Sequence, residues 1–173
     1  MSTEVIVITG PESSGKTTLA SQLSDYWKTP FVPEVARDYL KEKNSYEQHD
    51  LLEIAKRQHK QERALLSYFP EKIICDTDLL VIMIWSEAKY GYCAPWIYNT
   101  FESSIKQQTF PRYYYLCDSK IPWQADQLRE SPDNRDELFN LYIQKLKEYE
   151  LDHSIVKGEP KERLHQVLNG RDS

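Results

Sequence analysis

The sequence predicts one α/β domain, spanning residues 1–173, in which helices cover both faces of a parallel five-stranded sheet to give three layers. Strand-like and helix-like segments alternate along the chain, as they do where helices join parallel strands. A length of 173 residues suits a single domain with one sizeable core. No internal repeat, low-complexity segment or Gly/Ser-rich linker divides the chain.

The first half of the chain contains three expected strands and three expected helices. Residues 4–9 are rich in β-branched side chains and predict a buried strand, and residues 17–27 predict a helix with apolar residues at helical spacing. Residues 31–34 predict a short second strand. A surface helix, a third strand and a largely buried helix are then expected at residues 50–68, 72–75 and 79–88.

The second half repeats the alternation. Residues 113–117 predict a fourth strand and residues 154–156 a fifth. A last helix is expected to begin near Pro160, because proline suits the first turn of a helix. Residues 135–149 predict a helix whose inner side carries Leu138, Leu141, Tyr142, Leu146 and Tyr149.

Composition excludes several classes of partner. The net charge is −5 and basic residues are scattered among acidic ones, so we expect no nucleic-acid partner. The first apolar run is too short for a secretion signal or a membrane span, which predicts a cytoplasmic protein with no membrane contact. Oligomeric state stays open, a homo-oligomer included. The cysteines fit no zinc pattern and are expected as buried thiols: Cys75, Cys93 and Cys117.

A phosphate-binding loop follows the first strand. Residues 10–17 satisfy G-x-x-x-x-G-K-[ST] in full and lie between a strand and a helix, the context that this motif needs. Curled glycine-rich backbone points N–H groups at phosphate oxygens, and the helix adds its positive end. Lys16 is predicted to reach the β- and γ-phosphates, and the Thr17 hydroxyl to bind Mg²⁺. The predicted ATP-binding residues are Gly10, Pro11, Glu12, Ser13, Ser14, Gly15, Lys16, Thr17 and Thr18.

Other features narrow the class of nucleotide-binding protein. No Asn-Lys-x-Asp guanine-reading segment occurs, and its nearest counterpart, residues 117–120, lacks the asparagine, which disfavours a switch-type GTPase. Large motor ATPases usually need a longer chain. A small kinase is therefore the best class.

Two aspartates follow the third strand. Ligands of parallel α/β sheets collect at the carboxyl ends of strands, and a spacing of two in extended chain places Asp76 and Asp78 on one side. Such carboxylates can hold Mg²⁺, the role expected of Asp76, or accept hydrogen bonds from substrate hydroxyls. The alternative is a turn with two solvated aspartates.

Glu34 ends the second expected strand. It is a candidate to take the proton of the attacking hydroxyl, and Arg37 would meet it on one helical face. The alternative is a surface ion pair. Spacing alone does not decide whether Glu34 or Asp76 is the base.

A polar segment at residues 119–136 predicts a lid. Phosphoryl transfer needs cations over the moving phosphate, and Arg129 and Arg135 are the candidates. A solvated charged loop is the alternative.

Aromatic residues are dense in the middle of the chain. A flat heterocyclic substrate needs a stacking platform, and a positively charged ring gains further from an aromatic face. Core or interface packing is the alternative. The substrate-pocket candidates are Trp85, Tyr90, Trp96 and Trp123.

These motifs together resemble the ribosylnicotinamide kinase domain of the NadR family, over nearly the whole chain. Besides the phosphate loop, the resemblance rests on Val-Pro-Glu-Val-Ala-Arg-Asp-Tyr-Leu, Cys-Asp-Thr-Asp, Ile-Trp-Ser-Glu-Ala-Lys-Tyr-Gly, and Leu-Cys-Asp with Ile-Pro-Trp-Gln-Ala-Asp-Gln-Leu-Arg-Glu, at residues 32–40, 75–78, 84–91, 116–118 and 121–130. The phosphate loop is shared by a large superfamily, whereas the combination is much more specific. In many bacteria this domain follows an adenylyltransferase domain, and no His-x-Gly-His nucleotidyltransferase signature occurs in this sequence.

The resemblance implies a phosphate-loop nucleoside-kinase fold and transfer of the γ-phosphate of ATP to the 5′-hydroxyl of nicotinamide riboside, a small-molecule nucleoside. It implies that Asp76 and Asp78 contact ribose hydroxyls or metal-bound water, that Trp85 and Tyr90 line the substrate pocket, and that Arg129 belongs to the lid. Two alternatives stay open: a kinase for another nucleoside or small hydroxyl compound, and a regulatory module that binds ATP without transfer.

Overall fold

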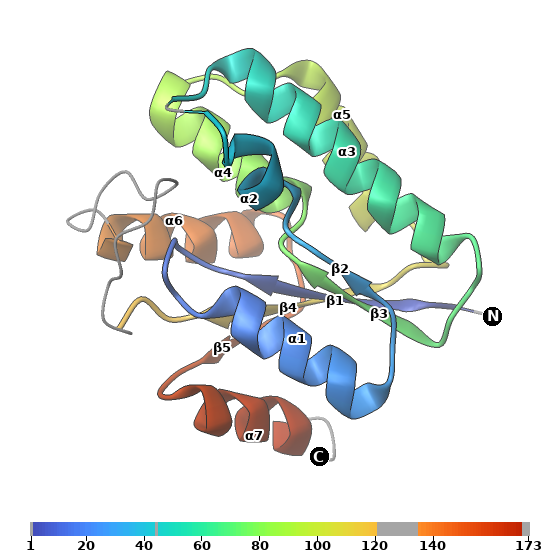
Figure 1. Cartoon of the computed structure of the whole chain (residues 1–173). Helices are drawn as coiled ribbons and strands as arrows, with labels where there is room; N and C mark the ends of the chain where they lie inside the picture. The colour runs from blue at the N-terminus through green and yellow to red at the C-terminus, as the bar shows by residue number, and fades with distance from the viewer. Residues whose placement is uncertain (1, 44, 121–134, 171–173) are drawn as a thin grey trace.

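The computed structural model describes residues 2–43, 45–120 and 135–170, and these residues form three layers (Figure 1). The strands are β1 (Glu4–Thr9), β2 (Phe31–Val32), β3 (Lys72–Asp76), β4 (Arg112–Cys117) and β5 (His153–Val156). The helices are α1 (Lys16–Trp27), α2 (Val35–Leu40), α3 (Gln48–Leu66), α4 (Leu79–Tyr90), α5 (Pro95–Ile105), α6 (Arg135–Glu148) and α7 (Pro160–Gly170).

The strands form one parallel sheet in the order β2-β3-β1-β4-β5 within the described residues. This arrangement confirms the predicted fold class. In the centre, Ile6 of β1 pairs with Ile74 of β3 on one side and with Tyr113 of β4 on the other. Because all strands run the same way, the segments that follow β1, β3 and β4 meet at one edge of the sheet, where ligands of such folds bind.

Side chains of the central strand alternate between the two faces of the sheet. Val5 and Val7 belong to the larger apolar cluster, which includes residues of α2 to α6, whereas Ile6 and Ile8 join α1 and α7 in a smaller one. All four side chains are fully buried. Buried on both faces, β1 shows the nearly continuous apolar sequence typical of a parallel strand.

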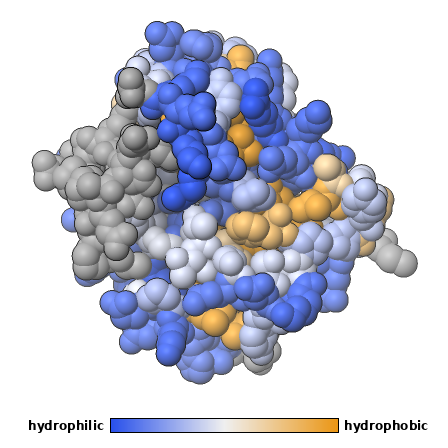
Figure 2. Space-filling model, viewed as in Figure 1, coloured by the Kyte–Doolittle hydropathy of each residue, from blue (hydrophilic) through white to orange (hydrophobic). Residues whose placement is uncertain are grey.

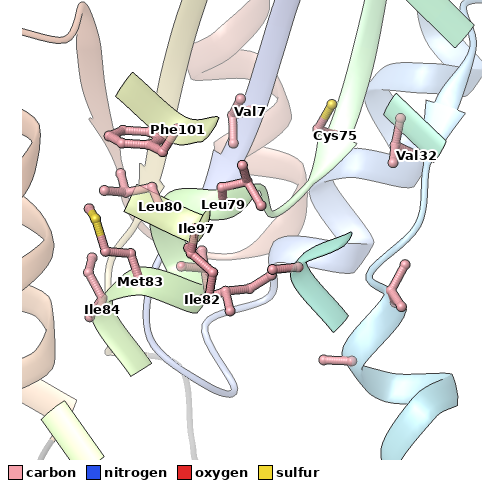
Figure 3. Packing of buried hydrophobic residues seen from close by; sticks show 14 of the residues in the cluster. Val7, Val32, Cys75, Leu79, Leu80, Ile82, Met83, Ile84, Ile97 and Phe101 are labelled. Atoms are coloured by element: carbon pink, nitrogen blue, oxygen red, sulfur yellow. The ribbon is translucent and has the colours of Figure 1, made fainter. Parts of the chain in front are cut away.

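The larger cluster is built mainly from α4. Figure 3 shows its side chains packed against those of α5 and the sheet, with Leu79, Leu80, Ile82, Met83, Ile84, Ile97, Phe101, Val7, Val32 and Cys75 labelled. Burial of this much apolar surface is the main force that stabilises the layer. It holds α4, and thereby the segment between β3 and α4, against the sheet.

The surface seen in Figure 2 is mostly hydrophilic where the structure is described, and hydrophobic residues reach it mainly in a band above α1. None of the helices within residues 2–43, 45–120 and 135–170 is both long and apolar enough to cross a bilayer. Cys75 and Cys117 are buried and Cys93 is half-buried, and all three are free thiols.

Two elements depart from the sequence-based expectations at the end of β2. The strand stops at Val32, two residues earlier than predicted, because Pro33 has no N–H for the ladder. The chain then turns into α2, a six-residue helix that was not predicted. Its buried residues Val35, Ala36 and Leu40 span too short a stretch to establish a helical period.

Helix α5 was also not predicted, although its sequence carries signals. Pro95 occupies its first turn, and its buried residues Ile97, Phe101 and Ser104 follow at spacings of four and three. This spacing is that of a helix with one face turned toward the core.

Candidate active site

The phosphate loop links β1 to α1 through three residues with left-handed backbone. Gly10, Ser13 and Gly15 have φ angles of 140°, 57° and 78°. A Cβ atom on Gly10 would lie 2.7 Å from the carbonyl oxygen of Cys117, so the loop lies directly against the end of β4 and tolerates only glycine there. Such curled backbone forms the concave amide surface that binds anions.

Two cations contact the loop backbone. Lys16 begins α1, is 7% exposed, and its Nζ donates to the carbonyl oxygen of Pro11 at 2.8 Å. Arg135 begins α6, and one of its terminal nitrogens donates to the carbonyl oxygen of Ser13 at 3.2 Å. Helix α6 therefore brings Arg135, 122 residues away in the chain, to the loop as expected of a phosphate-binding arginine.

Asp76 joins the loop at the end of β3. Its Oδ2 accepts a hydrogen bond from the Thr17 hydroxyl at 2.5 Å, and its Oδ1 is buried without a partner among the described residues. The side chain is 1% exposed. The pKa of Asp76 is raised to about 6, chiefly by burial and next by the charge of Glu34, against the opposing effects of Thr17 and Lys16.

The oxygen atoms of Thr17 and Asp76 fit a magnesium ion. Mg²⁺ is usually held by one or two protein oxygens together with phosphate and water oxygens. The unpaired Oδ1 of Asp76 is a buried acceptor that a cation or its bound water would satisfy. No group of three or more His, Cys, Asp or Glu side chains within the described ranges forms a metal cage, so phosphate oxygens would have to complete the coordination.

Glu34 lies at the entrance to α2. It is the residue before the first turn of this helix, and its side chain is only 10% exposed. Arg37, three residues later, approaches its carboxylate at 3.6 Å, which is the pairing expected from the spacing. Because the charge of Glu34 raises the pKa of Asp76, the two carboxylates share one site.

Asp78 does not join this group, contrary to the expectation that it lies on one side with Asp76. Thr77 between them has a φ of 69°, so the chain is not extended there. The Asp78 carboxylate caps α4 through the Leu80 N–H at 3.0 Å and accepts from the Tyr114 hydroxyl at 2.7 Å. Arg112 lies 3.4 Å away as a third partner. The described partners of Asp78 are thus groups of the framework, from α4 and β4.

Tyr142 of α6 was expected only as a core residue, but it adds a polar group near the site. Its side chain is fully buried, and its hydroxyl has no hydrogen-bond partner among the described residues. Burial raises its pKa, and the charges of Glu34 and Glu12 raise it further. Trp85 lies near enough to lower that pKa, without reaching hydrogen-bond geometry. Side chains of the phosphate loop, of the residue before α2, of α4 and of α6 therefore lie near one another: Glu12, Glu34, Trp85 and Tyr142.

The other predicted aromatic residues lie elsewhere. Tyr90 ends α4, and its hydroxyl donates to the Tyr46 carbonyl at 2.9 Å, in the segment before α3. Trp96 of α5 packs edge-on against His59 of α3, with ring centres 5.9 Å apart. Neither of these contacts involves Asp76, and a substrate role for Tyr90 or Trp96 stays a prediction.

Most of the predicted lid lies outside the described residues, and Trp123 and Arg129 are among those positions. The two described ends of the segment meet, since the Ser119 hydroxyl donates to Asp136 at 2.9 Å. Within the loop itself, Ser14 is buried, Glu12 is half-buried, and Thr18 is exposed on α1.

Comparison with known proteins places the chain in a family. A family profile described as "AAA domain" matches residues 5–163, which is most of the sequence. The chain belongs to this AAA-domain family. No curated protein sequence matches the chain significantly.

Solved structures share the fold of this AAA-domain chain at low sequence identity. Thymidylate kinase from Ehrlichia chaffeensis has a TM-score of 0.73 and 13% identity, covering 99% of this chain and 100% of that one. Deoxyadenosine kinase from M. mycoides, with products dCMP and dCDP bound, has a TM-score of 0.66 and 17% identity, covering 97% and 98%.

NadR protein in complex with NR is also similar, with a TM-score of 0.72 and 20% identity. The match covers 98% of this chain but 48% of NadR, so the chain spans about half the length of that protein. The fold of the AAA-domain chain is thus a phosphate-loop fold shared with nucleoside and nucleotide kinases.

Proposed function

We propose that the chain is an ATP-dependent kinase that phosphorylates the 5′-hydroxyl of nicotinamide riboside to give nicotinamide mononucleotide, a step of NAD salvage. One observation carries the kinase part of this proposal. A phosphate loop, a hydroxyl–carboxylate pair suited to Mg²⁺ and a second carboxylate converge at one edge of the sheet. A module that only bound ATP would not need Glu34 near Asp76.

The nucleotide side uses the loop, Lys16 and Arg135. Backbone N–H groups of residues 10–17 bind the phosphates, and Lys16 neutralises charge on the β- and γ-phosphates. Arg135, which donates to the Ser13 carbonyl, would engage the same oxygens once a nucleotide occupies the loop. Mg²⁺, when bound by Thr17 and Asp76, would screen charge that develops on the phosphates.

Glu34 is proposed as the base that accepts the proton of the 5′-hydroxyl. Asp76 is already bonded to Thr17 and suits the metal, which leaves Glu34 as the carboxylate free of that role. As the 5′-oxygen bonds to the γ-phosphorus, the bond from that phosphorus to the β,γ-bridging oxygen breaks, ADP leaves, and the hydroxyl proton passes to Glu34. Arg37 holds the Glu34 side chain at the mouth of α2.

The acceptor pocket is proposed to lie beside Glu34, because the side chains near it would suit a cationic ring. Glu12 and Glu34 supply negative charge, Trp85 an aromatic surface, and Tyr142 a hydroxyl that has no described protein partner. The nicotinamide ring of the riboside is positively charged, and NadR with NR bound is among the similar structures. Trp123 and Arg129 remain predictions for a lid that closes over this pocket.

A second candidate is a kinase for another nucleoside. Deoxyadenosine kinase and thymidylate kinase share the fold over nearly their whole length, and the phosphate loop and carboxylates would serve either acceptor equally.

The test is ADP release by the purified protein with MgATP and a panel of nucleosides. Nicotinamide riboside alone should stimulate release, with nicotinic acid riboside and the common deoxynucleosides as comparisons. Stimulation only by a deoxynucleoside would favour the second candidate. Absence of stimulation by any nucleoside would refute kinase activity.

A further inference from the structure

Arg163 is a buried cation that the proposed function has not used. It lies on α7, is 1% exposed, and is among the largest fully buried side chains of the described residues. A guanidinium is never deprotonated in proteins, so its burial requires several hydrogen-bond acceptors. Those acceptors come from three separate segments.

Each edge of the guanidinium has a partner. Its Nε donates to the carbonyl oxygen of Gly158 at 2.7 Å, before α7. One terminal nitrogen donates to the carbonyl oxygen of Ser14 in the phosphate loop. The other reaches Asp118, just after β4, at 3.3 Å to its carbonyl oxygen and 3.2 Å to Oδ1. Arg163 thereby links the phosphate loop to the end of β4 and to the segment before α7.

The contact with Ser14 determines where the next amide points. In a trans peptide the C=O and N–H groups point in opposite directions, and no cis peptide occurs in the described residues. Arg163 holds the Ser14 carbonyl toward α7, so the N–H of Gly15, in the same peptide, points away from α7. A cation on the carbonyl also polarises the peptide and strengthens that N–H as a donor.

Arg163 differs from the other two cations at the loop in the groups that surround it. Lys16 and Arg135 contact the loop carbonyls of Pro11 and Ser13, and both are proposed to engage phosphates directly. Arg163 is enclosed by α7, β4 and the loop, and its carboxylate partner Asp118 is itself buried. It therefore acts on the nucleotide only through the backbone.

We infer that Arg163 is a positioning residue of the phosphate loop, which orients the Ser14–Gly15 peptide so that the Gly15 N–H binds a nucleotide phosphate. This inference rests on the nucleotide-binding part of the proposed function and not on the identity of the nucleoside. It assigns α7, the element farthest from the loop in sequence, a role in nucleotide affinity.

The chain offers a matched control. Arg112 of β4 is also buried and paired with carboxylates, Glu62 and Asp78, and none of its described bonds goes to the phosphate loop. Arg112→Lys and Arg163→Lys each keep the charge but lose the planar fork, so both should destabilise the fold. Only the substitution of Arg163 should also weaken the binding of the nucleotide.

The experiment is titration calorimetry of MgATP into wild type, Arg163→Lys and Arg112→Lys, with urea unfolding of all three. We expect at least a tenfold weaker MgATP affinity for Arg163→Lys, affinity within about twofold of wild type for Arg112→Lys, and a higher KM for ATP with little change in KM for the nucleoside. Equal nucleotide affinity in the two folded variants would overturn the inference.

Two further outcomes are decisive. If Arg163→Lys does not fold, Asp118→Asn removes the counter-charge while leaving the guanidinium, and the inference then expects a severalfold loss of MgATP affinity, with an unchanged affinity overturning it. If wild type itself binds no MgATP, the proposed function fails and the inference with it.

Discussion

Asp76 is a buried carboxyl of the site whose ionised form is disfavoured. Its pKa rises from 3.8 to about 6, chiefly through burial and then through the charge of Glu34. A carboxyl with a raised folded-state pKa stabilises the fold below its unfolded pKa, and this stability is lost as the pH rises through about 6. Near neutral pH the ionised group therefore weakens the nucleotide-free protein and favours binding of a cation.

Asp76→Asn should separate stability from function. Removal of the charge should raise the free energy of unfolding of the nucleotide-free protein at pH 8, by roughly 3 kcal/mol at most, and by much less at pH 4.5. Turnover should fall strongly while ATP binding changes little. Urea unfolding at both pH values and steady-state kinetics measure the two effects. An equal or lower stability of the variant at pH 8 would show that Asp76 is not held in an unfavourable ionised state.

Lys16→Ala tests the phosphate position. Loss of the ammonium that stabilises the γ-phosphate should reduce turnover by about a hundredfold or more. Lys56→Ala, an exposed lysine on α3, serves as the control and should keep wild-type turnover. If Lys16→Ala kept near wild-type activity, the phosphates would have to lie elsewhere.

Tyr142→Phe tests the acceptor pocket. Its hydroxyl has no partner among the described residues, so its removal should change unfolding by less than about 1 kcal/mol but raise the KM for the nucleoside severalfold. Tyr114→Phe is the matched control: that hydroxyl is also buried but donates to Asp78 at 2.7 Å, so its loss should destabilise the fold by about 1–3 kcal/mol and spare the KM. An unchanged nucleoside KM in Tyr142→Phe would show that the Tyr142 hydroxyl has no role in nucleoside binding.

Some residues of the site belong to a contiguous sequence motif, whereas others depend on contacts between distant segments of the chain. Gly10, Gly15, Lys16 and Thr17 could be predicted because their motif is contiguous. Asp78 was placed wrongly because the left-handed backbone of the residue before it is not visible in a spacing of two. The roles of Tyr142 and Arg163 had no sequence signal, since each depends on contacts with segments more than 50 residues away in the chain.

At the scale of elements, the strands and most helices of the described residues could be predicted, whereas α2 and α5 were missed. β1 was predicted with its observed bounds, and α1, α4 and α6 within one or two residues. Helix α3 begins two residues before the prediction because Glu47 and Asp50 form a capping box across its first turn. Helix α2 is only six residues long, and its position after β2 places Glu34 at the site.

The turn from β1 into the loop is the element whose geometry is most restricted. Gly10→Ala would introduce a Cβ 2.7 Å from the Cys117 carbonyl oxygen at a φ of 140°, so it should destabilise the fold by roughly 2–4 kcal/mol and weaken MgATP binding. Gly91→Ala, at a φ of 64° with no atom within 4 Å of the new Cβ, should cost only about 1 kcal/mol. Urea unfolding and calorimetry compare the two. Equal losses would mean that contact with β4 does not restrict the loop.

For the whole molecule, the parallel sheet explains why residues far apart in sequence meet. Asp76 ends β3, and the other site residues lie in segments that follow other strands: Thr17 after β1, Glu34 after β2 and Arg135 after β4. The common strand direction brings the ends of these strands to one edge (Figure 1). The sequence therefore predicted the layers and the edge of the sheet at which these residues meet. The finer composition of the site depends on side-chain packing between α4, α6 and α7, which alternation of strands and helices does not encode.

Transfer of labelled phosphate tests the central claim most directly. Purified protein would be incubated with Mg²⁺, nicotinamide riboside and ATP carrying ¹⁸O on its γ-phosphate, and the products analysed by mass spectrometry. The label should appear in nicotinamide mononucleotide, at the 5′-phosphate, and should not appear there with Lys16→Ala. Label found only in inorganic phosphate, or retained in ATP, would contradict the account.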